Sequence, residues 1–124
     1  PGIEESQFGA LEEFSEAFTL EARARHIDQN GHVNNAHFIN WLCDAVPRAD
    51  EETICRIKVD FVHEILKGEK VSAWIKPAQA VSNPVYRKAL KQAEKVKAPH
   101  PTWLSALTCD GILAARGMIE LDSL

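Results

Sequence analysis

The sequence predicts an α+β fold in which one buried helix lies on an antiparallel sheet. Residues 33–46 carry apolar side chains over most of the circumference of a helix, which indicates burial on nearly all sides. Several other segments have the length and apolar content of strands. Asp110-Gly111 separates two of these segments and is a strong hairpin signal. A helix on one sheet of about five strands buries both apolar surfaces at once.

Length and composition exclude several classes of protein. The 124 residues fit one compact domain, and a net charge of -4 argues against nucleic-acid binding. No apolar run is long enough for a membrane span and no signal segment opens the chain, so a cytoplasmic setting is expected. Three cysteines without CxxC spacing predict no disulfide framework or zinc site. Each lies in an apolar stretch and is expected to be buried: Cys43, Cys55 and Cys109.

The first residues of the chain are acidic. Residues 1–16 contain five Glu and no Lys or Arg, and the chain begins without Met. We interpret residues 1–14 as an acidic linker or a cut end outside the core, and residues 15–124 as a single domain. From Phe18 to His26, apolar and polar residues alternate, which predicts a half-buried strand.

The helix and the later strands have clear boundaries. Asn34 or Asn35 can cap the helix, and Pro47 marks its end. Further strands are predicted at residues 53–65, 71–75, 103–109 and 112–121, with turns at 67–69 and 110–111. Residues 78–102 are left open as a strand or a short helix with a loop. This region holds a basic segment, Arg87 to Lys97, which is either a solvated face or a docking patch for an acidic partner.

A polar loop leads directly into the helix. Asp28, Asn30 and His32 alternate, so in an extended loop their side chains would point the same way. A carboxylate, a carboxamide and an imidazole are the groups that a hydrolytic site needs to activate water and to stabilise an oxyanion. The N-terminus of the helix would add backbone N–H groups and a positive dipole end. The alternative is an Asx-rich turn that only caps the helix, with His32 on the surface.

Glu64 is a second candidate for chemistry. Alternation along the predicted strand places Asp60, Val62 and Glu64 on one face. Glu64 becomes a useful general base only if this face lies against the polar loop and buries the carboxylate in part; otherwise it is a solvated side chain. The chain's histidines are spaced too loosely to favour a metal site, and no metal is expected. Cys43 lies well inside the apolar helix, where a thiol is a poor nucleophile.

These residues carry a resemblance to a known family. The run Asp28 to Asn35, followed by Phe38 and Trp41, resembles the D-x-N-x-HVNN-x-x-Y-x-x-W signature of the acyl-ACP thioesterases of plants and bacteria. The run Val59 to Gly68 resembles that family's strand after the helix, and Glu64 falls on its glutamate. The resemblance implies a hotdog fold, in which one antiparallel sheet wraps a long buried helix, and it implies no cofactor.

The resemblance also implies a site. Its catalytic residues would be Asp28, Asn30, His32 and Glu64, and its substrate-binding residues Asn34, Asn35, Phe38 and Trp41. Older accounts of the family give the nucleophile's role to a cysteine next to the glutamate, and here that position is Ile65. We therefore expect direct hydrolysis, in which Glu64 activates water. His32 and Asn30 would position this water or polarise the thioester carbonyl, while Asp28 orients its neighbours.

Three functions follow as expectations. The first is a hydrolase of fatty acid biosynthesis that cleaves fatty acyl-ACP. The family's intact members carry two hotdog domains, and this chain resembles the second, so it would form a homodimer or higher oligomer or pair with another hotdog domain. Gly31 and the single-domain length instead resemble the acyl-CoA thioesterases. A non-catalytic acyl-binding or dimerising domain is the third, and two carboxylates near an apolar acyl tunnel argue against it because their desolvation is costly.

Overall fold

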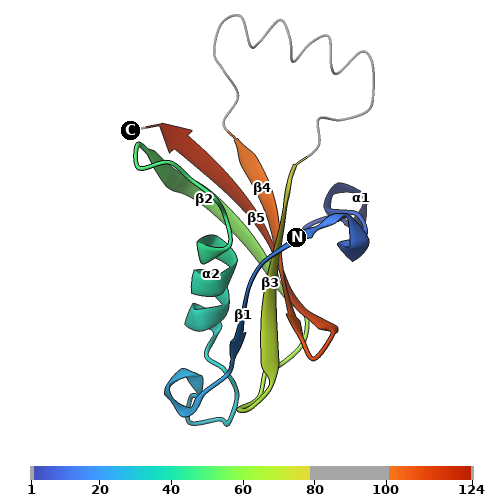
Figure 1. The fold of residues 1–124 in the computed structure, drawn as a ribbon, viewed down its shortest axis with the longest axis vertical. Helices are drawn as coiled ribbons and strands as arrows, with labels where there is room; N and C mark the ends of the chain where they lie inside the picture. The colour runs from blue at the N-terminus through green and yellow to red at the C-terminus, as the bar shows by residue number, and fades with distance from the viewer. Residues whose placement is uncertain (1, 79–100, 124) are drawn as a thin grey trace, which may run out of the picture.

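The protein is described by a computed structural model that covers residues 2–78 and 101–123. Five strands form one antiparallel sheet in the order β1-β3-β4-β5-β2 (Figure 1). The strands are β1 Ser15–Glu21, β2 Glu52–Phe61, β3 Lys70–Pro77, β4 Thr102–Cys109 and β5 Ile112–Ser123. The helices are α1 Glu5–Phe8 and α2 Asn35–Asp44, with 3-10 turns η1 Leu11–Glu13 and η2 Ala24–His26. The sheet lies between α2 on one face and α1 on the other, which confirms the α+β prediction (Figure 1).

Helix α2 begins where the sequence predicts. Asn34 is its cap, because the Asn34 side chain accepts a hydrogen bond from the Ala36 amide at 2.8 Å. Only one side of the helix is buried, through Phe38, Trp41 and Leu42, while Ala36 and other residues are exposed. The expectation of burial on nearly all sides is therefore wrong, because α2 packs on a single layer of strands, β3, β4 and β5.

The middle of α2 lies close to the sheet. A Cβ atom added at Gly117 on β5 would stand 3.5 Å from the methyl carbons of Leu42, which is an ordinary van der Waals contact, so the Leu42 side chain packs directly over β5. The buried Ser105 hydroxyl on β4 donates a hydrogen bond to the Leu42 carbonyl at 2.9 Å. Leu42 belongs to the last turns of the helix, where carbonyls lack helical partners, so Ser105 satisfies one of them. The main core lies between these elements.

The N-terminal segment, residues 2–14, covers the other face of the sheet. Ile3, Phe8 and Phe14 are buried there against Leu104 and Ala106 of β4. The expectation that this segment lies outside the core is therefore wrong. Its acidic residues dominate the sequence pattern, but its three spaced apolar side chains bury enough surface to hold it on the sheet.

An ion pair connects the end of this segment to the sheet. The Lys76 ammonium on β3 lies 3.1 Å from the Glu13 carboxylate and 5.1 Å from the centre of the Phe14 ring. Lys76 is almost fully buried, because its stem packs under the segment while its charged end reaches Glu13. The hydrogen bond from Lys76 lowers the pKa of the Glu13 carboxyl, with a further contribution from the Ala10 amide.

Two predicted strands end earlier than expected. β1 stops at Glu21 and the chain then turns into η2, although the alternation of apolar and polar residues predicts a strand as far as His26. β2 stops at Phe61, because the amides of Val62 and His63 both donate to the Ala114 carbonyl and leave the regular register. The alternation rule therefore fails beyond Phe61. Asp60 faces Arg116 at 3.0 Å on the outer side of the sheet, and Glu64 points elsewhere.

The hairpin prediction is confirmed. Asp110 and Gly111 both have positive φ, 47° and 85°, which is the type I′ geometry that follows the twist of the paired strands. Among the cysteines, Cys109 is buried and Cys43 is half-buried, but Cys55 is exposed, so its expected burial is wrong. The basic segment from Arg87 to Lys97 lies outside the described residues. Within the described ranges, no helix is both long and apolar enough to cross a membrane.

Candidate active site

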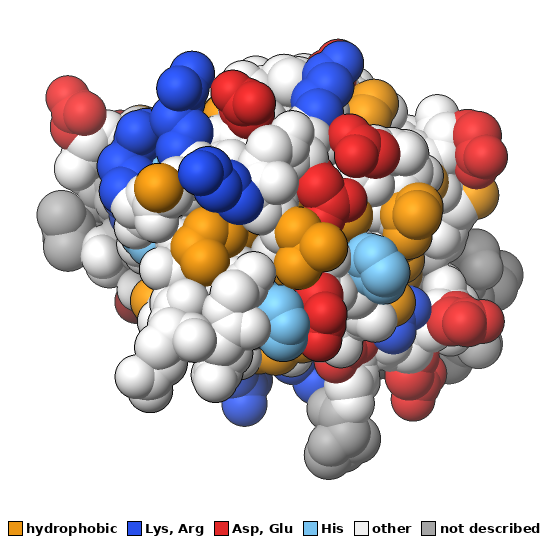
Figure 2. Space-filling view, turned by 90° about the horizontal axis from the view of Figure 1, so that it is seen from below, with side chains coloured by type: hydrophobic (Ala, Val, Ile, Leu, Met, Phe, Trp, Pro, Cys, Tyr) orange, Lys and Arg blue, Asp and Glu red, His pale blue; other side chains and the backbone are white. Residues whose placement is uncertain are grey.

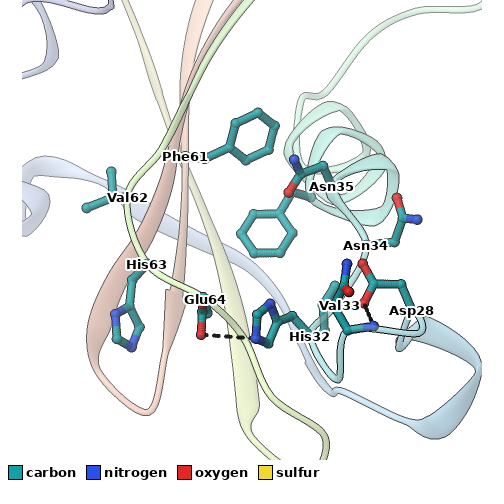
Figure 3. A pocket seen from close by; sticks show the side chains of 11 residues that line it. Asp28, His32, Val33, Asn34, Asn35, Phe61, Val62, His63 and Glu64 are labelled. Atoms are coloured by element: carbon teal, nitrogen blue, oxygen red, sulfur yellow. Dashed lines mark hydrogen bonds and ion pairs between the residues drawn. The ribbon is translucent and has the colours of Figure 1, made fainter.

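An open cleft of about 470 Å³ lies where the polar loop, the start of α2 and the end of β2 meet (Figure 3). It is lined by Asp28, Asn30, His32, Val33, Asn34, Asn35, Phe38, Phe61, Val62, His63 and Glu64. The structure thus brings seven of the eight predicted site residues to one cleft. Trp41 is the exception.

The polar loop is a tight turn and not the extended segment that the alternation implies. The Asp28 amide donates to the His32 carbonyl at 2.9 Å, and the Gly31 amide donates to the Asp28 carbonyl at 3.1 Å. Gly31 has a φ of 85°, a conformation that glycine adopts without strain. One oxygen of the Asp28 carboxylate accepts the Asn30 amide at 2.9 Å, as in an Asx turn. Asp28 therefore shapes the loop, as both the catalytic and the capping interpretations allow.

A backbone hydrogen bond joins this loop to the segment after β2. The Val33 amide donates to the Ile65 carbonyl at 2.8 Å, so the residues before them, His32 and Glu64, become neighbours. His32 Nε2 lies 3.4 Å from a Glu64 carboxylate oxygen (Figure 3). Ile65 is fully buried and the Cys109 thiol reaches the Glu64 carbonyl at 3.8 Å, so the backbone at Glu64 is anchored in the core.

The two side chains of this pair remain open to solvent in the single chain. The side chain of His32 is 40% exposed and that of Glu64 is 64% exposed. Glu64 does lie against the polar loop, but the partial burial expected of a tuned base is not present. Water therefore has free access to the pair, and its exclusion requires a substrate or a second domain over the cleft.

One backbone amide at the start of α2 is available to a ligand. The amides of Asn34, Ala36 and His37 bond to the His26 carbonyl, the Asn34 side chain and the Asn34 carbonyl, respectively. Within the described residues, the Asn35 amide has no such partner, and Asn35 lines the cleft. A free N–H at the N-terminus of a helix suits a developing negative charge, so the Asn35 amide is a candidate oxyanion donor.

The interior wall of the cleft is aromatic. Phe38 is buried and Phe61 is half exposed, and their ring centres are 5.7 Å apart. Trp41 does not reach the cleft: it is buried between His26 and His37, one helical turn beyond Phe38. The i, i+3 spacing predicts that Phe38 and Trp41 lie on one face of the helix. It does not predict which of the two lines the cleft, because neighbouring turns of that face pack against different parts of the fold.

Sequence reasoning missed three residues of the cleft, namely Phe61, Val62 and His63. All three directly precede Glu64 in the sequence. Their position beside a candidate catalytic residue was the signal that could have identified them. Val62 and His63 lie on the side of the segment away from His32 (Figure 3).

The described residues do not favour a metal centre or a cysteine nucleophile at this site. Among the described residues, no three His, Cys, Asp or Glu side chains form a group that could hold a metal ion. Burial raises the pKa of the Cys43 thiol, with a smaller effect of Asp44, and Cys43 does not line the cleft. A thiol of this kind is a weak nucleophile.

Comparisons with known proteins found one family match and several similar structures. The family described as "Acyl-ACP thioesterase C-terminal domain" matches residues 10–104. A search of curated proteins gave no match to this sequence. Among solved structures, a thioesterase from Thermus thermophilus, complexed with coenzyme A and Zn, is similar with a TM-score of 0.68 and 22% identity, covering 90% of this chain and 85% of that one.

Two larger proteins share the same fold. An acyl-ACP thioesterase from Bacteroides thetaiotaomicron has a TM-score of 0.63 and 20% identity over 87% of this chain. The 12:0-ACP thioesterase from Umbellularia californica has a TM-score of 0.64 and 16% identity over 90% of this chain. This chain covers only 37% and 35% of those two proteins, respectively. These likenesses confirm the predicted hotdog fold.

Proposed function

Because this chain belongs to the family of acyl-ACP thioesterase C-terminal domains, we propose that it hydrolyses a fatty acyl thioester on acyl carrier protein and releases free fatty acid. The observation that carries this proposal is the meeting of Glu64 and His32, 3.4 Å apart, at a cleft with an aromatic interior. An acyl chain suits the Phe38 and Phe61 wall, and its thioester would then lie beside the polar pair.

In the proposed reaction, the Glu64 carboxylate accepts a proton from water, and the water oxygen attacks the thioester carbon. His32 and Asn30 orient this water or the carbonyl, and Asp28 holds the loop that carries both. The carbonyl oxygen becomes an oxyanion, for which the Asn35 amide is the candidate donor. When the intermediate collapses, the C–S bond breaks and the carrier sulfur leaves as a thiol with the proton that Glu64 accepted, which returns Glu64 to its carboxylate form. Ile65 is buried and offers no nucleophile, in accord with direct attack by water.

Substitution of Glu64 tests this assignment. We expect Glu64→Gln to lower kcat about a hundredfold or more, because an amide cannot accept the proton, while acyl affinity and fold are retained. Steady-state hydrolysis and circular dichroism measure the two effects. Glu51→Gln is the matched control, since Glu51 is exposed in the turn before β2 and does not line the cleft. A Glu64→Gln protein with wild-type turnover would remove Glu64 from the mechanism.

The nearest competing function is an acyl-CoA thioesterase. The coenzyme A in the Thermus thermophilus structure favours it, since that protein has the same fold and a similar length. Hydrolysis of matched acyl-ACP and acyl-CoA substrates separates the two functions. Faster cleavage of acyl-ACP supports the proposal, and faster cleavage of acyl-CoA replaces it. Absence of hydrolysis from a protein with an intact cleft points to an acyl-binding domain. The cytoplasmic location remains a prediction.

A paired assembly is part of the proposal. The large hydrophobic side chains that stay exposed include Ile57 and Phe61 of β2, the edge strand beside the cleft, and Val62 directly after it. Figure 2 shows hydrophobic side chains among histidine and acidic side chains on the end of the molecule that is the lower end in Figure 1. A second copy, or a second hotdog domain, would cover the apolar residues along β2 and shield the Glu64 and His32 pair from water.

A further inference from the structure

His26 is buried at the point where η2 meets the polar loop. Its ring nitrogen Nδ1 accepts a hydrogen bond from the Arg23 amide at 2.9 Å, which closes the η2 turn. Its carbonyl accepts the Asn34 amide at 3.0 Å. Asn34 is the cap of α2 and lines the cleft. One residue thus bonds to the chain on both sides of the loop that carries Asp28, Asn30 and His32.

The His26 ring also fixes the loop against α2. It packs edge-on against the His37 ring and the Trp41 ring, with centres 5.0 Å away in both cases. These residues lie on the first two turns of the helix. The position of the loop relative to the helix N-terminus therefore depends on the His26 ring being seated between η2 and α2.

We propose that His26 is a positioning residue whose neutral ring holds the polar loop in its active geometry, so that protonation of His26 releases the loop and slows hydrolysis in acid. An Nδ1 atom that accepts an N–H bond must be unprotonated, and a proton on it would oppose the Arg23 amide. The part of this inference that concerns hydrolysis rests on the proposed function. The part that concerns loop geometry does not.

The surroundings of His26 all disfavour its charged form. Burial is the main cause that lowers the pKa of His26, followed by the positive charges of Arg25, His37 and Arg23. Arg23 and Arg25 belong to the His26 turn and His37 faces it from α2. Among the described residues, no carboxylate is a resolved influence on its pKa. A pKa below the ordinary value means that the folded state resists protonation while the unfolded state accepts it. Acid therefore destabilises this geometry progressively below a pH of about 6.5.

Two variants separate the hydrogen bond from the packing. In His26→Asn, the amide oxygen Oδ1 takes the place of Nδ1, so it can accept the Arg23 amide but cannot titrate. In His26→Phe, an aromatic ring fills the same space but offers no acceptor. The Arg23 and Asn34 backbone amides report the loop geometry in solution NMR spectra, without any substrate.

For the wild-type protein, we expect the Arg23 and Asn34 amide signals to shift with one midpoint below about pH 6.5, matching the midpoint of the His26 ring. In His26→Asn, this transition should disappear because Asn does not titrate, and kcat should decline less between pH 8 and acid than it does in the wild-type protein. In His26→Phe, kcat should fall about tenfold or more at all pH values with an intact circular dichroism spectrum.

Three results would overturn the proposal. They are a wild-type amide transition that persists in His26→Asn, amide signals in the wild-type protein that do not follow the His26 ring, and full kcat in His26→Phe. If no form of the protein hydrolyses thioesters, the proposed function fails, and the amide titration still decides whether His26 holds the loop.

Discussion

Asp28 shapes the polar loop through its side chain. Its carboxylate accepts the Asn30 amide and holds the turn that presents His32. We therefore expect Asp28→Asn to keep most of the activity, because its amide oxygen can accept the same bond. Asp28→Ala should lower kcat about tenfold or more by loosening the turn.

Steady-state kinetics of the two Asp28 variants check this expectation. A loss in Asp28→Asn as large as in Glu64→Gln would instead show that the negative charge of Asp28 takes part in the chemistry. Equal activity of Asp28→Ala and wild type would show that the turn does not need this side chain.

At the scale of single residues, the motif predicted which residues line the cleft better than it predicted which way their side chains point. The residue types around Gly31 indicated a polar site, and seven of the eight residues do line one cleft. Alternation assigned Asp60 and Glu64 to one face, but the backbone leaves the regular register after Phe61. Two amides sharing the Ala114 carbonyl cause this change, and no residue type in the sequence signals it.

At the scale of elements, Ser105 connects β4 to α2. Loss of its hydroxyl in Ser105→Ala leaves the buried Leu42 carbonyl without its partner, so we expect the free energy of unfolding to fall by about 1–3 kcal/mol. Denaturant titration measures the loss. The control is Ser15→Ala on the exposed side of β1, for which a change within about 0.5 kcal/mol is expected. Equal effects of the two substitutions would show that the Ser105 bond contributes no net stability.

The elements themselves were largely predictable. The start of α2, the β4–β5 hairpin and the strand β3 follow from Asn34, Asp110-Gly111 and the apolar run before Pro77. The exposed side of α2 was not predictable. An apolar pattern indicates which side chains a helix can bury, but it does not indicate whether the fold covers the helix on one side or on both. Ile39 and Cys43 remain half-buried for this reason.

At the scale of the whole molecule, the Glu13 and Lys76 pair makes attachment of the N-terminal segment sensitive to acid. A carboxyl with a lowered pKa stabilises the folded state above its ordinary pKa, and this contribution is lost as the pH falls through the folded-state value. We therefore expect Glu13→Gln to lower the Tm more at pH 7 than at pH 3.

Thermal unfolding of the wild-type and Glu13→Gln proteins at both pH values tests this. Glu5→Gln is the control, since Glu5 is an exposed carboxylate of the same segment. A Tm difference for Glu13→Gln that stays constant between pH 7 and pH 3 would contradict the role of the ion pair.

Pairing along β2 has its own test. We expect the wild-type protein to sediment as a dimer, and Ile57→Lys to shift it toward monomer, because a charge would enter the apolar side of the edge strand. Sedimentation equilibrium over a range of concentrations measures the change. Lys58→Ala is the control on the opposite side of β2. A wild-type protein that remains monomeric at every concentration would refute the paired assembly.

The N-terminal segment has a consequence for how copies of this chain can meet. By covering Leu104 and Ala106, it withdraws one broad side of the sheet from contact with other molecules. Among the described residues, Ile57 and Phe61 of the edge strand β2 stay exposed outside this cover. In the proposed pair, a contact made by the same β2 residues of both copies closes by two-fold symmetry. The segment therefore directs the proposed pairing to β2 and away from the covered face of β4.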